Sequence, residues 1–339
     1  ARAAAERMAQ TLGEAVGKSI GYRVRGESKV SKATRIEVVT EGILTRMIQS
    51  DPELSGVGAV IFDEFHERSL NADLGLALCR EIAGALRDDL MLLVMSATLD
   101  AEPVATLMDD APMVTSAGRS YPVETRWLEK PLRKEDRLED ATARLIEKAV
   151  SETQGGVLVF LPGEGEIRRT AQRLKLPNDC HVHTLFGAMD FKAQRAAIQP
   201  AETGRKIVLA TSIAETSLTI QDVRVVVDAG RARRARLDPG SGMSRLVTEK
   251  VTKAEATQRQ GRAGRVAEGI CYRLWTKGEE GGLQPFPPAE IEAADLAGLA
   301  LELAAWGATP DDLPFLTPPP SGTFSEAQSL LQMLGILDG

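Results

Sequence analysis

The residues best suited to chemistry follow a short apolar run. That run, Ala59–Phe62, predicts a buried strand and leads directly into the acidic pair Asp63 and Glu64. In open α/β sheets the chemistry lies at the carboxyl ends of strands. There Asp63 could hold Mg²⁺, and Glu64 could polarise the attacking water of a phosphoryl transfer. A solvated acidic strand end is the alternative interpretation of the same two residues.

Hydroxyl groups follow two other predicted strands. Residues 92–95 predict the next buried strand, which ends in Ser96, Ala97 and Thr98. The run at 211–220, rich in serine and threonine, follows a strand predicted at 207–210. Hydroxyls at a strand end can bind phosphates or sugar hydroxyls. Ser96, Ala97 and Thr98 are of interest because they follow the strand next after the acidic pair, not because of their residue types.

A basic segment with interleaved glycines occupies residues 258–265. Its arginines Arg262 and Arg265 are three residues apart, so on a helical turn they would share one face. A guanidinium engages phosphate oxygens bidentately, and two of them could neutralise transition-state charge as arginine fingers. The alternative is a solvated basic helix, which the glycines make less attractive.

Two other features favour structural interpretations. Residues 13–19 resemble a phosphate-binding loop, but three residues separate the glycines instead of four, and a helix-like stretch precedes them. The sequence therefore predicts no phosphate-cradling glycine loop in this chain. His181 and His183 share one face of a predicted strand, and without a third ligand they are expected to be surface histidines.

Composition limits the class of protein. The chain has 339 residues, enough for two to three domains, with 43% hydrophobic and 26% charged residues, which excludes a disordered chain. No apolar run is long enough to span a membrane. Three separated cysteines suit a reducing cytoplasm and argue against disulfides or a zinc site. The net charge of −7 means that nucleic acid would have to meet a local basic lining.

The order of elements predicts an α/β protein with two parallel-sheet units joined near residue 120. Strands are expected at residues 36–40, 59–62, 92–95, 157–161, 182–185, 207–210, 223–227 and 270–274. The first unit has few strands for a complete sheet. After residue 276, proline-rich loops flank helices expected at 289–306 and 325–334, with Ser325 as an N-cap, which suggests a compact accessory domain.

Taken in order, these motifs resemble those of the superfamily-two DEAH-box ATP-dependent RNA helicases. Residues 40–47, 63–70 and 330–335 are similar to the HrpB-type bacterial members in particular, and Phe65 replaces the alanine that names the DEAH box. The resemblance covers essentially the whole chain. It implies two RecA-like domains, at 1–119 and 120–276, and a winged-helix domain at 277–339. It also implies ATP bound between the RecA-like domains and RNA lying across both.

The resemblance assigns residues to the nucleotide. Asp63 and Glu64 match the Mg²⁺-binding and water-activating positions, and His66 matches the residue that links nucleotide state to the second domain. The other implied contacts are Gln258 for the water, Arg262 and Arg265 as fingers, Ser96 and Thr98 for coupling to unwinding, Ser217 and Thr219 near the ribose, and Arg7 on the base. Gln221 stands where eukaryotic relatives carry an acid.

The resemblance also assigns residues to RNA. Thr40 and Thr211 match phosphate contacts, one from each domain. Residues 231–248 match a strand-separating β-hairpin, with turn residues at 238–242. The positive charge of one arm comes from Arg231, Arg233, Arg234 and Arg236. For any single arginine of this arm, a solvated basic loop is an equally good interpretation.

The expected function is that of an ATP-dependent helicase, a nucleoside triphosphatase that uses ATP and Mg²⁺ to move along single-stranded RNA in the cytoplasm. Family members carry a P-loop before the position of Ala1 and further domains after that of Gly339, so the chain is expected to be an internal piece that is inactive alone. Two alternatives remain open, a DNA-directed translocase and a nucleic-acid-binding scaffold without turnover.

Overall fold

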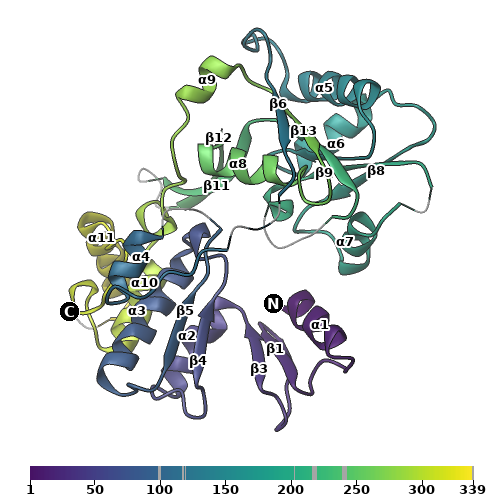
Figure 1. The fold of residues 1–339 in the computed structure, drawn as a ribbon. Helices are drawn as coiled ribbons and strands as arrows, with labels where there is room; N and C mark the ends of the chain where they lie inside the picture. Colours follow the sequence, from purple (N-terminus) through teal and green to yellow (C-terminus); the bar gives the residue numbers. More distant parts are fainter. Residues whose placement is uncertain are drawn as a thin grey trace. The chain divides into compact units, whose positions relative to one another are not determined.

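The computed structural model describes residues 1–97, 101–116, 118, 120–201, 203–215, 220–238 and 243–337. The chain divides into two compact units. One unit combines Ala1–Val114 with Pro288–Gly339, and the other is Thr115–Pro287. Figure 1 shows the elements of both.

The second unit contains a sheet of six parallel strands in the order β6-β13-β10-β7-β9-β8. Their bounds are Val123–Arg126 (β6), Gly269–Arg273 (β13), Val223–Asp228 (β10), Gly156–Phe160 (β7), Arg205–Ala210 (β9) and Cys180–Leu185 (β8). Alternate residues of the buried strand β7 enter two different cores, with Val157 and Val159 in one and Leu158 and Phe160 in the other. Both faces of the sheet are therefore covered, as expected for parallel strands.

Helices supply the cover of this sheet. They are α5 (Leu138–Glu152), α6 (Glu164–Arg173), α7 (Phe191–Ile198) and α8 (Lys253–Gly261). The short helix α9 (Lys277–Gly281) also belongs to this unit, but its residues are not buried. Ile146 of α5 and Ile167 of α6 lie in the core with Val157, whereas Ala197 of α7 lies in the other core. The strands expected from sequence in this unit are all present, and β6 is an addition.

The predicted hairpin also belongs to this unit. Strands β11 (Arg231–Asp238) and β12 (Met243–Lys250) pair antiparallel from Arg231 opposite Lys250 to Asp238 opposite Met243. The expected arms are confirmed. The rest of the expected turn, residues 239–242, lies outside the described residues.

The first unit holds two smaller sheets. In one, β1 (Ile20–Val24) pairs antiparallel with β2 (Glu27–Lys29) and parallel with β3 (Ile36–Val39). In the other, β4 (Ala59–Phe62) and β5 (Met91–Val94) are parallel. Helices α1 (Arg2–Thr11), α2 (Glu41–Ser50), α3 (Leu70–Ala85) and α4 (Glu102–Leu107) complete this part. Strands β3, β4 and β5 were expected from sequence, whereas β1 and β2 were not.

The C-terminal segment packs with the first unit. Its elements are η3 (Glu290–Glu292), α10 (Ala297–Trp306), η4 (Pro310–Asp312) and α11 (Ser321–Met333). Leu299 of α10 and Phe324 of α11 share one core with Leu78 of α3, and Figure 1 draws α10 beside α3. The buried apolar residues in the described part of this segment belong to the core of the first unit.

Two expected helix boundaries in this segment are wrong. The helix expected at 289–306 is a short 3₁₀ turn followed by α10, which begins only at Ala297. The last helix begins at Ser321 after Pro320, so Ser325 lies inside α11 and is not its N-cap. Among the described residues of this segment there is no strand, and its winged-helix character stays a prediction.

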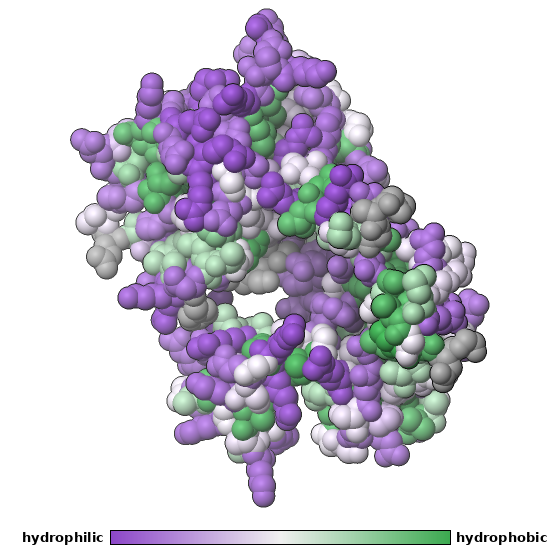
Figure 2. All heavy atoms as spheres, turned by 180° about the vertical axis from the view of Figure 1, so that it is seen from behind, coloured by the Kyte–Doolittle hydropathy of each residue, from purple (hydrophilic) through white to green (hydrophobic). Residues whose placement is uncertain are grey.

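Hydrophilic residues cover most of the face that Figure 2 draws in both units, interrupted by hydrophobic patches. The exposed large apolar side chains of the first unit include Ile61, Met91 and Leu93 on β4 and β5. None of the described helices is both long and apolar enough to cross a bilayer.

Candidate nucleotide and RNA site

The acidic pair and the serine segment lie side by side, as the sequence predicts. Strands β4 and β5 run in register, with Phe62 opposite Val94. Beyond them the backbones stay paired, since Met95 N donates to Phe62 O (2.8 Å) and Phe65 N donates to Met95 O (3.0 Å). Asp63 therefore leaves the sheet next to Ser96, and both residues are exposed.

Phe65 explains part of this turn. Its side chain is buried in the core of the first unit and meets the Phe62 ring edge-on, with the ring centroids 6.2 Å apart. The phenyl group thus anchors the turn to the apolar side of β4. The backbone must fold back sharply to bury it, and Glu64 adopts a left-handed conformation with φ of 52°.

The polar side chains of the turn contact one another. Asp63 Oδ1 accepts a hydrogen bond from Glu64 N (2.9 Å), and Glu64 Oε2 lies 3.6 Å from His66 Nδ1. The same His66 nitrogen accepts a hydrogen bond from Ala97 N (3.3 Å). His66 therefore connects the acidic pair to the serine segment inside the first unit.

The donor set of this turn suits magnesium. Asp63 and Glu64 offer carboxylate oxygens at a strand end, and nowhere in the described part of the chain do three His, Cys, Asp or Glu side chains gather as a metal cage. Mg²⁺ binds through one or two carboxylates while keeping waters and substrate phosphates. Two carboxylates fit that ion, whereas zinc would require three or four closely placed ligands.

The two glycine-interleaved arginines differ from each other in burial. Helix α8 ends at Gly261, and Arg262 is its C-cap. Arg262 is buried, with 5% of its surface exposed, whereas Arg265 lies beyond the turn and is exposed. Turn bonds continue past the end of α8, from Arg262 N to Arg259 O (3.1 Å) and from Ala263 N to Gln260 O (3.0 Å), so the shared face of the two arginines stays a prediction. Gln258, on α8 itself, is half-buried.

A buried arginine that sequence reasoning missed fixes this helix. Arg259, 1% exposed, donates from Nε to Glu215 Oε1 (2.7 Å) and from Nη1 to Asp228 Oδ1 (2.8 Å). Its guanidinium also stacks over the Phe160 ring, 5.1 Å from the centroid. Burial raises the pKa of the Glu215 carboxyl, although the Arg259 charge opposes that shift. Arg259 thus joins α8 to the hydroxyl-rich segment and to the end of β10.

The two threonines assigned to RNA phosphates occupy matching places in the two units. Thr40 follows β3 at the N-cap of α2, and Thr211 follows β9 at the N-cap of the 3₁₀ turn η2 (Ser212–Ala214). Neither hydroxyl makes the side-chain capping bond of its helix. Each hydroxyl is thus placed beside backbone N–H groups at a helix start, where phosphate binds readily.

The sequence comparisons match both units to helicase models. Residues 2–107 match the DEAD/DEAH box helicase family, and residues 139–267 match the helicase conserved C-terminal domain. Over its whole length the chain is 50% identical to the ATP-dependent RNA helicase HrpB of Escherichia coli, covering 42% of that protein. Both units of the chain thus resemble the DEAD/DEAH-box helicases. Its resemblance to the HrpB type, first seen in the motifs, is confirmed.

Other relatives agree with this family. The chain is 38% identical to the pre-mRNA-splicing factor ATP-dependent RNA helicase prp22 of Schizosaccharomyces pombe, covering 30% of it. A crystal structure of Escherichia coli DEAH/RHA helicase HrpB superposes with a TM-score of 0.95 at 49% identity, over all of this chain and 44% of that one. The α/β fold with RecA-like units is thereby confirmed. The chain spans less than half the length of these relatives.

Three arginines of the hairpin formed by β11 and β12 are paired with acids of the second unit. Arg233 meets Glu166 of α6 (3.3 Å), and Arg236 meets Glu249 across the hairpin (2.8 Å). Arg234 binds both Glu249 (3.1 Å) and Glu255 (2.5 Å), the latter in the first turn of α8. Arg234 therefore braces the hairpin against α8. The RNA-binding roles of Arg231, Arg233 and Arg234 stay predictions.

Several assigned residues gain no geometry from the structure. Thr98, Ser217 and Thr219 lie outside the described residues. Arg7 is exposed on α1. The P-loop-like residues 13–19 lie between α1 and β1, where the Glu14 carboxylate accepts from Ser19 Oγ (3.0 Å) and Ile20 N (3.3 Å). These residues follow a helix as expected. The Glu14 carboxylate accepts the hydrogen bonds that a phosphate would accept in a phosphate-binding loop.

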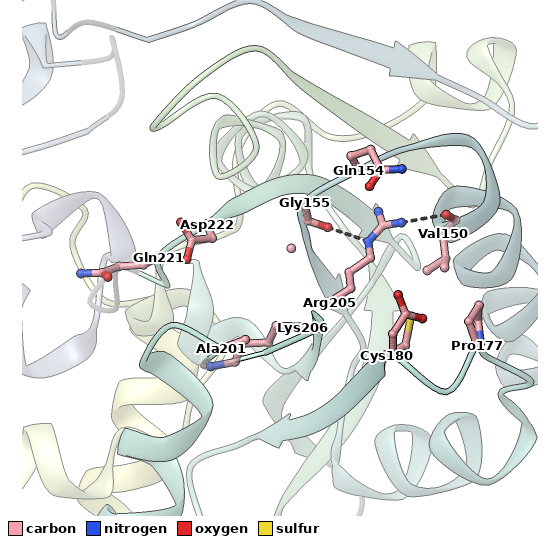
Figure 3. Close-up of a pocket in the computed structure, with 13 residues that line it drawn as sticks. Val150, Gln154, Gly155, Pro177, Cys180, Ala201, Arg205, Lys206, Gln221 and Asp222 are labelled. Carbon is pink, nitrogen blue, oxygen red and sulfur yellow. Dashed lines mark hydrogen bonds between the residues drawn. The ribbon is translucent and has the colours of Figure 1, made fainter.

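A cavity of about 460 Å³ in the second unit lies away from these residues. Its lining includes Gly156, Cys180 and Arg205, the first residues of β7, β8 and β9, whereas Thr211 follows the last residue of β9. Figure 3 draws the residues that line it. Its cations bind helix ends: Arg205 donates to Val150 O (2.7 Å) and Gly155 O (2.6 Å), and Lys206 donates to Ala196 O (3.2 Å). These side chains cap the C-termini of α5 and α7, so the cavity is not a candidate nucleotide site.

The segment that carries Arg262 and Arg265 contains two glycines with different surroundings, Gly261 and Gly264. Tyr121 N donates to Gly264 O (2.9 Å), and a Cβ added at Gly264 would lie 2.5 Å from Tyr121 O. A Cβ added at Gly261 would meet no atom within 4 Å. We expect Gly264→Ala to displace Arg265 and lower kcat for ATP hydrolysis by about 10²-fold, the usual effect of a misplacement of about 1 Å.

Gly261→Ala is the matched control and should leave kcat within about twofold of the parent, since Gly261 lies within α8 without a positive φ and Ala has a higher helix propensity than Gly. Both variants are compared with the parent in steady-state hydrolysis with saturating RNA. Equal kcat values for the two variants would contradict the proposed anchoring of the loop at Tyr121.

Proposed function

We propose that this chain is the motor core of an ATP-dependent RNA helicase, in which Mg²⁺-ATP hydrolysis drives movement along single-stranded RNA and duplex unwinding. The carrying observation is the pairing of the β4 and β5 ends, which sets Asp63 and Glu64 beside Ser96. The relatives named above, described as ATP-dependent RNA helicases, support the same function.

The residues of each unit suggest a division of labour. Asp63 and Glu64 would hold Mg²⁺, which when bound neutralises phosphate charge. Glu64 would also orient the attacking water and accept its proton, because its carboxylate is half-exposed at the turn. Arg265, exposed after α8, would place a guanidinium on the developing charge, with Gln258 on the water and Arg262 as the second finger.

RNA would be held mainly through its backbone. The Thr40 and Thr211 hydroxyls supply one phosphate contact from each unit, and the hairpin arm with Arg231 and Arg233 lines the strand path. Backbone contacts of this kind do not distinguish RNA from DNA unless a 2′-hydroxyl is read. The choice of RNA over DNA therefore rests on the relatives.

A reducing compartment suits this chain, and we propose the cytoplasm. All three cysteines are free thiols, and burial raises the pKa of Cys79 and of Cys271 to about 12. Such thiols are protonated and inert at neutral pH.

The test separates chemistry from binding in the intact protein. Glu64→Gln should keep the affinity for Mg²⁺-ATP while lowering kcat by about 10²-fold, since an amide cannot take the proton from water. Asp63→Asn should instead weaken Mg²⁺-dependent nucleotide binding. Affinity is measured by equilibrium titration with a non-hydrolysed ATP analogue, and kcat by phosphate release with saturating RNA.

Ser50→Ala, in the last turn of α2, is the control and should change neither quantity. Loss of affinity in Glu64→Gln together with normal affinity in Asp63→Asn would reverse the two roles. Phosphate release by the parent that single-stranded DNA stimulates as strongly as RNA would argue against an RNA-directed motor.

A further inference from the structure

The last residue of the acidic turn is held by the C-terminal segment. Arg68 ends the turn in a left-handed conformation with φ of 50°. Its guanidinium donates from Nε and Nη2 to the two oxygens of Asp73, each at 3.0 Å, and from Nη2 to Thr317 Oγ1 at 2.9 Å. Asp73 lies on α3 with a fully buried side chain, so the fork of Arg68 has a fixed target.

A second residue of the C-terminal segment, Glu290, also contacts the end of the acidic turn. Glu290 N donates to Arg68 O (3.0 Å), and Glu290 Oε2 accepts from Leu70 N (2.7 Å). Leu70 is the first residue of α3, where backbone N–H groups lack partners within the helix. Glu290 thus spans the junction between the acidic turn and α3.

Acids surround this junction. Glu41 accepts from Ser69 Oγ (2.7 Å), and burial raises the pKa of the Glu41 carboxyl, with Glu67, Glu290 and Asp73 adding to the shift. Burial likewise raises the pKa of Asp73, against the effect of Arg68. The Arg68 guanidinium is the group that binds Asp73 and Thr317 together, so its removal would leave the Asp73 carboxylate buried without its cation.

The geometry explains why the turn needs outside support. Glu64 and Arg68 are both non-glycine residues in the left-handed region, and such conformations persist only when the surrounding structure determines them. Phe65 fixes the middle of the turn in the core, and the strand pairing fixes its start. Its end is fixed by Asp73 and by two residues of the C-terminal segment, more than 200 positions later in the chain.

We propose that Thr317 and Glu290, acting through Arg68, are positioning residues for Asp63 and Glu64, so that the C-terminal segment sets the hydrolytic rate of the motor. This inference rests on the proposed function for its kinetic consequence. Its structural consequence, the ordering of residues 63–70 by the C-terminal segment, is independent of turnover.

The main test is Thr317→Val, which removes the hydroxyl and keeps the side-chain shape. In the intact protein we expect kcat for RNA-stimulated hydrolysis to fall about tenfold, with KM for ATP changed less than twofold, since only the geometry of the acidic pair is altered. Hydrogen exchange of the amides in residues 63–70 should become faster, because the end of the turn loses a support.

Thr309→Val is the matched control. Thr309 lies in the same segment, and its hydroxyl binds Asp312 in the first turn of η4 instead of Arg68 (2.7 Å). It should change neither kcat nor exchange in residues 63–70. Arg68→Lys serves as a second variant: it keeps a cation for Asp73 but cannot hold Asp73 and Thr317 with one planar fork, so its kcat should fall below that of Thr317→Val.

The outcomes separate this inference from the proposed function. If Thr317→Val exchanges faster but the parent does not hydrolyse ATP, the C-terminal segment orders the turn as inferred, and the proposed motor function is wrong. Normal exchange and normal kcat in Thr317→Val, with an active parent, would overturn the inference and leave the motor intact. Equal losses in Thr317→Val and Thr309→Val would also overturn it, since they would show only a general loosening of the segment.

Discussion

Replacing Arg265 by alanine should lower kcat for RNA-stimulated ATP hydrolysis on the order of 10³-fold, the effect of losing an arginine finger. Arg265 is exposed after the turn that ends α8, and the bond from Tyr121 N to Gly264 O fixes the loop next to it. An exposed guanidinium on a fixed loop can reach the developing phosphate charge. The measurement is steady-state phosphate release by the intact protein at saturating RNA and ATP.

Arg262 should behave differently. It is almost fully buried at the C-cap of α8, so Arg262→Ala should lower both kcat and the thermal stability of the protein. Arg265→Ala should leave the melting temperature unchanged. Arg144→Ala, an exposed arginine on α5, is the control and should alter neither quantity. Near-normal turnover in Arg265→Ala would remove that residue from the chemistry.

Strands that consist almost entirely of apolar residues could be predicted from the sequence. β7 and β9 are buried almost throughout, and their bounds differ from the predicted ones by at most two residues. β6 was missed because Val123–Arg126 carries one apolar residue and three polar ones, and it gains its place by pairing at the sheet edge with β13. Pairing partners of this kind are long-range and leave no local pattern.

The candidate site was predictable where chemistry follows a strand directly. Asp63, Ser96 and Thr211 lie where the ends of β4, β5 and β9 place them. The different burial of Arg262 and Arg265 could not be predicted from their spacing, because α8 ends at Gly261 and the loop that follows buries Arg262 and leaves Arg265 exposed.

The supports of the site were not predictable from spacing at all. Arg259 meets a carboxylate 44 residues away, and Arg68 meets a hydroxyl 249 residues away. The hairpin, by contrast, has a strand register that itself accounts for a supporting ion pair. Its register places Glu249 opposite Ala232, diagonal to Arg234, a distance that long side chains span in an antiparallel pair.

The largest expected loss of stability follows from Arg259→Met. Methionine keeps most of the volume but leaves the Glu215 and Asp228 carboxylates buried, with 7% and 0% of their residues exposed. Breaking a buried ion pair from one side costs about 3–5 kcal/mol. We expect the loss in the second unit, measured as faster hydrogen exchange in peptides from β7 and β10, with peptides from α3 in the first unit as the internal reference.

The pH dependence of that loss identifies its cause. Burial raises the pKa of Glu215 and the Arg259 charge lowers it, so removing Arg259 raises the folded-state pKa further above the ordinary value. Below the unfolded-state pKa of about 4.3 both states bind the proton, and the ionised carboxylate adds no cost. As the pH rises through the higher folded-state pKa, the variant should lose stability relative to the parent.

The triple variant Arg259→Met with Glu215→Gln and Asp228→Asn decides between charge and packing. Neutral amides in the same places remove the buried charge, so exchange in β7 and β10 should return most of the way to the parent rates, and the pH dependence should disappear. If the triple variant exchanges as fast as Arg259→Met at every pH, the loss comes from the packing of the guanidinium over Phe160. The buried ion pairs would then contribute little to holding α8 against the end of β10.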